Sequence, residues 1–381
     1  MFQKIIKLLQ TSNFKLLTSK PFGLDISDYS IEIVSLQGSK SNPKLSALGR
    51  EILTPGIIEE GRILNKASLE LALKNLLSNP QFGKIMSRKL IFSLPESKSF
   101  IHIFELPKDL NRTEILEFIK SQAIQTFPFP LNELYFDFQL KGNEILLVAA
   151  QKEIVDNYLE IFKNCKLHPI ALENESISWS RALIKPRSEI SLLRGKEKII
   201  LVVDIGAKIT NLVLFDEDEL KLSFSVKIAG NKFTRAISDK LNISLKKAEE
   251  IKKNFGLNPE MEEGKVFSIL QKEILEIIKE IRKIDSYFWQ KNKRKIEKII
   301  LIGGSALLPY LPAYLAENLE KKVEIGNPLR KVNVDTLEEK ELLKETLKID
   351  SVIYSTAFGL ALRGLEKNPQ KAGINLIKEV K

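Results

Sequence analysis

The sequence contains very few of the residues from which disulfides and metal sites are built. It has one cysteine, Cys165, and two histidines, His102 and His168. A single cysteine cannot form an internal disulfide, and without a CxxC pair the chain has no zinc framework. These absences indicate a protein of a reducing cytoplasm.

Long apolar runs are also absent. No stretch reaches the roughly 18 consecutive apolar residues that a membrane-spanning helix needs, and the first residues lack the apolar core of a signal peptide. We therefore expect a soluble or peripheral protein. Residues 1–20 alternate apolar positions with lysines, which predicts an amphipathic helix that either packs on the body or contacts an anionic membrane surface.

The net charge of +10 arises from 59 basic and 49 acidic residues spread along 381 positions, with lysine clusters at 244–253 and 291–298. No aromatic residues are interleaved with these clusters and no nucleic-acid-binding module is recognisable, so we do not expect nucleic acid as a partner. With 44% hydrophobic residues the chain is long enough for two or three folded domains.

The usual nucleotide-binding loops are missing. The chain has no GxxxxGK[ST] sequence and no GxGxxG after a strand, so a P-loop and a dinucleotide-binding fingerprint are excluded. Any nucleotide would have to be held by other parts.

Two similar strand meanders are visible. The first comprises FGLDIS, SIEIVSL and KLSALGREIL, and the second KIILVVDIG, TNLVLF and LKLSFSVKIAG. Asp25-Ile26-Ser27 and Asp204-Ile205-Gly206 occupy the same place in each, which suggests a duplicated lobe. Apolar periodicity predicts helices over 112–126, 152–164, 175–184 and 265–294.

Three turns could together bind a nucleotide. Backbone N–H groups in the two strand turns can cradle phosphate, and Asp25 and Asp204 can hold Mg²⁺ through its waters. Gly303-Gly304-Ser305, between a strand and a helix, would let a planar base lie against backbone. Each piece alone is more often an ordinary turn or cap; their common order and spacing favour function.

These segments resemble the superfamily of actin, hexokinase and heat-shock chaperones. FGLDISDYSIEIVSL is similar to its first phosphate motif, LVVDIGAKITNLVLF to its second and IILIGGSALLPYL to its adenosine motif, while Ala248-Glu249-Glu250-Ile251-Lys252 is similar to the AExxK helix of its bacterial members. The resemblance implies an α/β, actin-like (ribonuclease H-like) two-lobed fold with a duplicated βββαβα core. It also implies ATP with Mg²⁺, bound through Asp25, Ser27, Asp28, Tyr29, Ser30, Asp204, Gly206, Ala207, Lys208, Thr210, Asn211, Glu249, Lys252, Gly303, Gly304 and Ser305.

Within the superfamily the chain most resembles the PilM family of type IV pilus assembly. TPGIIEEGRI at 54–63, the segment 104–140 with its PFP break, LLVAAQKEIVDNYL at 146–159 and GLALRGL at 359–365 carry this resemblance. It implies an ATP-binding cytoplasmic scaffold at the inner face of the cytoplasmic membrane. The N-terminal peptide of a PilN-like protein would sit in a groove between the first lobe and its inserted α+β subdomain.

The resemblance also implies domain boundaries. They are an N-terminal helix at 1–20, a first-lobe core (1A) at 21–50 and 156–195, an inserted subdomain (1C) at 51–155, a second-lobe core (2A) at 196–225 and 296–366, a cap (2B) at 226–295 and a polar tail at 367–381.

Several positions depart from the family pattern. Ser27 stands where a glycine is expected, Asp28 and Glu32 add negative charge beside the phosphate turn, and Tyr310 replaces another glycine. Hydrolysis needs a residue that orients water. Glu173 and Glu175 are positional candidates, although helix N-termini favour acids without any catalytic role. We expect a nucleotide binder with weak or no ATPase activity.

Two other functions stay open. An FtsA-like cell-division scaffold would share the fold and the nucleotide, and a metabolite kinase would need a catalytic aspartate that residues 165–180 do not offer.

Near the end, Ile374-Asn375-Leu376-Ile377 is similar to the INLLP motif with which PilN proteins commonly begin. This segment would either occupy the partner groove, in cis or in a neighbouring molecule of a homo-oligomer, or be a frayed polar end.

Overall fold

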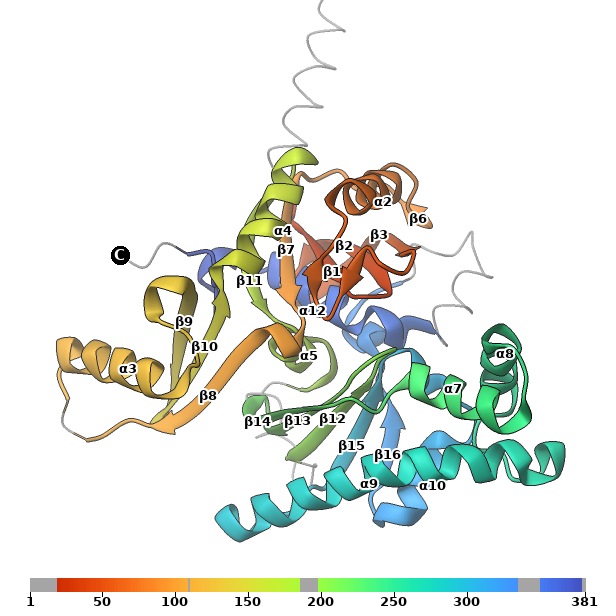
Figure 1. Ribbon diagram of the computed structural model, residues 1–381. Coiled ribbons are helices and arrows are strands. Elements are labelled where there is room, and N and C mark those ends of the chain that lie inside the picture. The colour runs from red at the N-terminus through yellow and green to blue at the C-terminus, as the bar shows by residue number, and fades with distance from the viewer. Residues whose placement is uncertain (1–18, 109, 186–197, 335–349, 379–381) are drawn as a thin grey trace, which may run out of the picture. The chain divides into compact units, whose positions relative to one another are not determined.

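The computed structural model describes residues 19–108, 110–185, 198–334 and 350–378. By their contacts these residues form two units (Figure 1). Unit 1 takes its described residues from 19–182, 328–334 and 356–378, and unit 2 from 183–327 and 350–355. The amphipathic helix expected at 1–20 lies, except for its last two residues, outside the described residues.

Unit 1 is built on a six-stranded sheet with the order β11-β7-β1-β2-β3-β6. Its strands are β1 (Phe22–Ile26), β2 (Ser30–Ser39), β3 (Asn42–Ile52), β6 (Phe82–Gly83), β7 (Lys89–Leu94) and β11 (His168–Asn174). The first three form the antiparallel meander expected from the sequence, while β7 and β11 run parallel to β1. β11 therefore lies at an edge of the sheet.

Four helices belong with this sheet: α2 (Lys66–Ser78), α4 (Lys152–Asn164), α5 (Glu175–Leu183) and α12 (Ser355–Gly364). The buried leucines of α2, Leu69, Leu73 and Leu76, recur at helical spacing and join the core of the sheet. α12 packs against β1 and α5 through its backbone. A Cβ on Gly23 would lie 2.2 Å from the carbonyl oxygen of Ala357, and one on Gly359 would lie 2.1 Å from that of Ser178.

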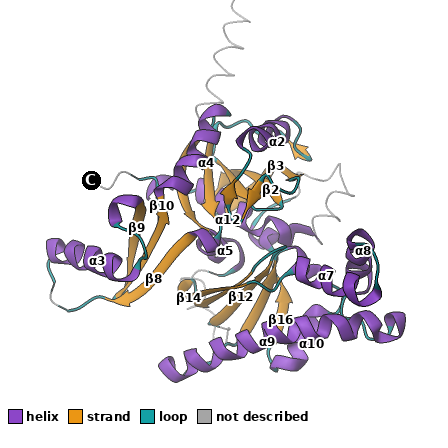
Figure 2. Cartoon of the chain, in the orientation of Figure 1, coloured by secondary structure: helices purple, strands orange, loops and turns teal. Residues whose placement is uncertain are grey.

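The chain leaves the six-stranded sheet after β7 and forms a second, three-stranded sheet, shown with its helix α3 in Figure 2. This inserted subdomain comprises β8 (Ser99–Glu105), α3 (Arg112–Thr126), β9 (Leu134–Lys141) and β10 (Glu144–Gln151), in the order β8-β10-β9. It begins later than the expected range of 51–155, because α2 and β7 belong to the six-stranded sheet and its core.

α3 has the bounds that the sequence predicts. It starts with a capping box in which the side chain of Asn111 accepts from the backbone of Glu114, and the side chain of Glu114 accepts from the backbone of Asn111. It ends because Phe127 precedes a proline and is extended, with φ −85° and ψ 140°.

Unit 2 repeats the strand order of unit 1. Its sheet runs β14-β13-β12-β15-β16, with β12 (Ile199–Ile205), β13 (Thr210–Asp216) and β14 (Glu219–Val226) antiparallel. β15 (Lys298–Ile302) and β16 (Lys322–Ile325) are parallel to β12. This order corresponds to β3-β2-β1-β7-β11 in unit 1, and it confirms the duplicated core expected from the two meanders.

The described residues of unit 2 also form the helices α7 (Gly230–Leu241), α8 (Leu245–Phe255), α9 (Lys265–Asn292) and α10 (Leu311–Leu319). Short 3₁₀ or two-stranded elements make up the rest of both units: β4 (Ile58–Glu59), β5 (Arg62–Ile63), η1 (Glu96–Lys98), η2 (Leu131–Glu133), η3 (Met261–Gly264), η4 (Gly304–Leu307), η5 (Pro328–Lys331), η7 (Ser351–Tyr354) and η8 (Pro369–Lys371). Within the described part of the chain, no helix is both long and apolar enough to span a bilayer.

The close approach of α12 to β1 can be tested by Gly23→Ala. The added Cβ would meet a backbone oxygen that cannot move without shifting the helix, so we expect a loss of about 1–3 kcal/mol in the free energy of unfolding. Gly304→Ala is the control, since nothing lies within 4 Å of its added Cβ. Urea unfolding measures both, and an unchanged midpoint for Gly23→Ala would contradict this packing.

Candidate functional site

The second phosphate motif lies in unit 2, where β12 ends. The carboxylate of Asp204 accepts a hydrogen bond from Nδ2 of Asn211 (3.0 Å), its partner on β13. Oδ1 of Asn211 in turn accepts from the hydroxyl of Ser225 on β14 (2.7 Å). This chain of contacts fixes the orientation of the Asp204 carboxylate at the end of an otherwise apolar strand.

The turn after β12 is closed and tied to the next helix. The backbone N–H of Gly206 donates to the carbonyl of Ile209 (3.1 Å), and the hydroxyl of Thr210 donates to the carbonyl of Ile228 (2.6 Å). The carbonyls of Gly206 and Ala207 accept from the first residues of α7, Gly230 (3.0 Å) and Asn231 (2.8 Å). Lys208, at the tip of the turn, is exposed.

The adenosine motif lies against this turn. Gly303 has φ +80°, and a Cβ there would lie 2.5 Å from Oδ1 of Asp204, so only glycine permits the approach. Gly304 has open space on its Cβ side, which leaves its backbone approachable by a flat ligand. Oγ of Ser305 lies 2.8 Å from where a Cβ of Gly230 would be.

A buried lysine closes the arrangement. Nζ of Lys252 on α8 donates to the carbonyl of Gly230 (3.1 Å) and to the hydroxyl of Thr234 (2.9 Å), and it pairs with Glu249 (2.7 Å). The hydroxyl of Thr234 donates to Glu249 (2.5 Å). Residues from three distant segments, at 204–211, 230–252 and 303–305, thus meet around Gly230.

Burial sets the charges of this pair. Burial lowers the pKa of Lys252 below its ordinary value despite the attraction of Glu249. Burial would raise the pKa of Glu249, but the hydrogen bonds from Lys252 and Thr234 outweigh it and hold that pKa below its ordinary value. Near neutral pH Glu249 is therefore a carboxylate with one oxygen engaged by Thr234 and Lys252 and the other near Lys253 (3.3 Å).

Gly230 and Thr234 were not among the residues singled out from the sequence. Both are buried or packed at the start of α7, and neither belongs to a motif with a recognisable spacing. The sequence feature that could have indicated them is the pair Ala229-Gly230, two small residues between a strand and a helix.

The first phosphate motif, in unit 1, is closed by its own serine. The hydroxyl of Ser27 accepts from the backbone N–H groups of Tyr29 (3.2 Å) and Ser30 (3.0 Å). It also donates to the carbonyl of Ser30 (3.1 Å). In this state the N–H groups expected to face phosphate are engaged by a side chain.

The two unexpected acids of this motif have structural partners. The carboxylate of Asp28 accepts from the backbone of Glu60 (2.6 Å) and Gly61 (2.7 Å), the turn between β4 and β5. Glu32 pairs with Arg50 (2.7 Å), its neighbour across β2 and β3. Burial raises the pKa of Glu32, although the guanidinium of Arg50 opposes the shift.

Asp25 is buried near the end of β1. The pKa of Tyr158 is raised above its ordinary value, first by burial and then by the charges of Asp28, Glu175 and Asp25. Among the residues that the structure describes, no three His, Cys, Asp or Glu side chains gather as a metal site.

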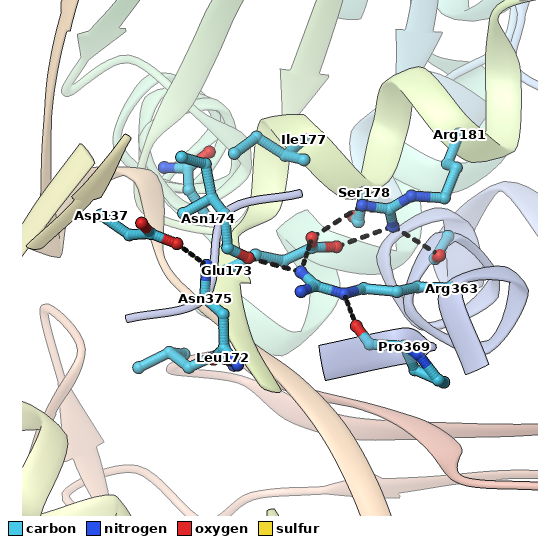
Figure 3. A network of polar contacts seen from close by, with 12 residues as sticks. Asp137, Leu172, Glu173, Asn174, Ile177, Ser178, Arg181, Arg363, Pro369 and Asn375 are labelled. Atoms are coloured by element: carbon cyan, nitrogen blue, oxygen red, sulfur yellow. Dashed lines mark hydrogen bonds and ion pairs between the residues drawn. The ribbon is translucent and has the colours of Figure 1, made fainter. Parts of the chain in front are cut away.

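Glu173, the residue considered for water activation, is fully buried in an ionic network (Figure 3). Its two oxygens accept from Arg181 (2.7 Å each), and Arg363 donates to one of them (2.5 Å). Burial would raise the pKa of Glu173, but Arg181 and then Arg363 outweigh it and hold the pKa below its ordinary value. A carboxylate engaged in this way is poorly placed to accept a proton from water. Glu175 accepts the backbone N–H of Glu96 (3.1 Å).

The family model and a solved structure point to the same family. The model of the family described as "Type IV pilus assembly protein PilM" matches residues 23–365. A chain of the solved "PilM-PilN type IV pilus biogenesis complex" is 27% identical, with a TM-score of 0.76 over 91% of this chain and 99% of that chain.

Two further proteins are more distantly similar. The ethanolamine utilization protein EutJ from Carboxydothermus hydrogenoformans is 14% identical, with a TM-score of 0.52 over 90% of this chain and 89% of that chain, and shares the fold alone. The cell division protein FtsA from Staphylococcus epidermidis is 22% identical over 203 residues, 48% of this chain. That match spans only 42% of FtsA. The expected actin-like α/β fold is confirmed by the structural similarities.

The role of Glu173 can be tested by Glu173→Gln, which keeps the shape and removes the charge. Because Arg363 and Arg181 would lose their counter-ion in a buried place, we expect a loss of about 3–5 kcal/mol in the free energy of unfolding at pH 7. Glu117→Gln is the control, since Glu117 is exposed and pairs with the exposed Lys120. Urea unfolding distinguishes the two variants.

The difference in unfolding free energy between wild type and Glu173→Gln should also depend on pH. The folded-state pKa of Glu173 is lowered from 4.5, so its stabilisation is present above pH 4.5 and is lost as the pH falls through the folded-state value. The stability difference between wild type and Glu173→Gln should therefore be constant near neutrality and narrow in acid. A gap that widens below pH 4.5 would contradict this assignment.

Proposed function

Because the chain belongs to the type IV pilus assembly protein PilM family, we propose that it is an ATP-binding scaffold of a type IV pilus assembly machine. The observation that carries the nucleotide part is the meeting of three motif segments around Gly230 in unit 2. We further propose that it works at the cytoplasmic face of the inner membrane.

The residues around Gly230 suit a nucleotide. Gly303 and Gly304 allow backbone to approach a flat base, and Glu249 and Lys252 supply the polar groups that the AExxK resemblance assigns to the ribose and base. The turn from Gly206 to Lys208 would face the phosphates. Asp204, oriented by Asn211, would hold Mg²⁺ through its waters. Asp25 has the corresponding place near the end of β1 in the first phosphate motif. The magnesium would neutralise phosphate charge.

Scaffolding is favoured over turnover. Both oxygens of Glu173 are engaged by arginines and its pKa is lowered, so it lacks the properties of a general base. Glu175 already accepts a backbone hydrogen bond. We propose weak or no ATPase activity.

The proposed partner is the N-terminal peptide of a PilN-like membrane protein. The similarity to a chain of a PilM-PilN complex supports this choice. Its docking surface would lie between the first lobe and the inserted subdomain. The match to FtsA supports an FtsA-like scaffold as the second candidate, although that match covers about half of the chain.

The nucleotide proposal is tested by calorimetry with ATP and Mg²⁺. Asp204→Asn and Glu249→Gln should each weaken binding at least about tenfold, which corresponds to about 1.4 kcal/mol. Glu250→Gln is the matched control, because this neighbour on α8 is exposed and pairs with the exposed Lys247. Thermal melting of each variant checks folding, and phosphate release should stay near background. Equal ATP affinity in Glu249→Gln and Glu250→Gln would contradict the site.

Ser27 provides a second test, in which the substitution is expected to strengthen ATP binding rather than weaken it. Its hydroxyl occupies the N–H groups of Tyr29 and Ser30, so phosphate must displace it before binding them. Ser27→Gly should therefore strengthen ATP binding several-fold, while Ser41→Gly, in the exposed turn after β2, should leave it unchanged. A weaker affinity in Ser27→Gly would show that the serine itself contacts the nucleotide.

A further inference from the structure

The segment Gly373–Ile377 is packed into unit 1 rather than frayed. After an exposed stretch around Lys367 and Asn368, burial returns: Ile374, Asn375 and Leu376 are 0%, 3% and 1% exposed. Ile374 and Leu376 join the apolar core of the six-stranded sheet, and Ile377 packs against it. Gly373, with φ +106°, makes the turn that leads into this segment.

The segment lies along β11, the edge strand of the sheet. The backbone N–H of Leu376 donates to the carbonyl of Leu172 (2.9 Å), and the segment then turns, with the N–H of Lys378 donating to the carbonyl of Asn375 (3.1 Å). Oδ1 of Asn375 accepts from the N–H of Leu172 (3.0 Å), so this side-chain amide takes the place of a peptide group (Figure 3). Edge strands carry main-chain groups that accept another extended chain, and β-strand addition is a common mode of peptide recognition.

Two further contacts come from other elements and a third comes from β11. The backbone N–H of Asn375 donates to Asp137 on β9 of the inserted subdomain (2.9 Å). Arg363 on α12 donates to the carbonyl of Ile374 (2.6 Å) while it holds Glu173. Nδ2 of Asn375 donates to Ile170 (3.3 Å). We call the surface formed by Ile170 and Leu172 of β11 together with Asp137 and Arg363 the edge surface.

The edge surface is complementary to an aliphatic–Asn–aliphatic sequence. Two apolar side chains enter the core, one asparagine satisfies main-chain groups of β11, and the remaining bonds go to backbone atoms of the segment. Except for the hydrogen bond from Asn375 to Gln370 (3.2 Å), these contacts do not depend on the covalent link through residues 366–372. A separate peptide with the same pattern could make them.

We infer that Gly373–Ile377 occupies the proposed peptide-docking surface in cis, as a displaceable competitor of a partner's aliphatic–Asn–aliphatic peptide. The inference deepens the proposed function and rests on it for the identity of the partner. The edge surface lies where that function requires docking, because it includes β11 of the first lobe and β9 of the inserted subdomain. A partner would have to displace the chain's own segment before docking.

The first experiment uses a chain ending at Ala372 and a fluorescent peptide, AGINLIKEV, that copies residues 372–380. The shortened chain should bind the peptide. The full chain should bind it about 100-fold more weakly, because a tethered segment competes at an effective concentration of about 1 mM against an assumed peptide Kd of about 10 μM. A peptide with alanine for asparagine should not bind. A folded shortened chain that fails to bind AGINLIKEV would overturn the inference.

A second variant covers the case in which the shortened chain does not fold. Asn375→Ala in the full chain weakens the internal competitor, so added AGINLIKEV should bind at least tenfold more tightly than to wild type. Asn368→Ala is the matched control, since Asn368 is exposed and precedes the segment. Equal affinities in the two variants would contradict the inference. A wild-type dimer that becomes monomeric on shortening would overturn the assignment in cis.

A competition experiment separates this inference from the proposed function. An N-terminal PilN peptide that displaces AGINLIKEV from the shortened chain, and binds the full chain more weakly, supports both. If AGINLIKEV binds and the PilN peptide does not, the result supports the inference on the edge surface and contradicts PilN as the partner. If the PilN peptide binds both chains equally and does not displace AGINLIKEV, the result supports PilN as the partner and contradicts the inference.

Discussion

The buried carboxylate of Glu173 is the contact on which the organisation of unit 1 depends. It sits at the end of β11 and neutralises Arg181 from α5 and Arg363 from α12, two residues far apart in the sequence. Arg363 then holds the carbonyls of Pro369 and Ile374. A buried ion triad of this kind is costly to break because each lost partner leaves a charge away from water. The edge strand β11, helices α5 and α12 and the segment that follows α12 are therefore tied together at one point.

That role explains why an acid in this position need not be catalytic. Position in the chain made Glu173 a candidate for activating water, whereas its surroundings make it an anion shared by two guanidiniums. The contrast with unit 2 is informative. There the Cβ side of Gly304 is open, and the buried Lys252 pairs with the partly exposed Glu249 beside Gly230. One unit uses buried charge to hold its fold, and the other places buried charge beside a surface that a ligand can reach.

The sequence predicted much of the fold for physical reasons. Apolar strands with charged ends, repeated in two meanders, are enough to indicate two sheets of the same order. Capping residues and the proline after Phe127 delimit α3. The motif residues Asp204, Lys252 and Gly303 could be named because their spacing is characteristic. Gly230 and Thr234 could not, since a small residue at the start of a helix has no pattern of its own until its neighbours in space are known.

The sequence by itself determined the strand periods, the turns, the family and the identity of most groups around Gly230. Only the tertiary structure decided how those groups are used. It showed that Ser27 closes its own turn, that Asp28 and Glu32 serve structural partners, and that Ile374-Asn375-Leu376 lies buried on the edge of β11. The physical reason is that local patterns are set by neighbours along the chain, whereas the partner of a hydrogen bond or a charge is set by packing between distant segments.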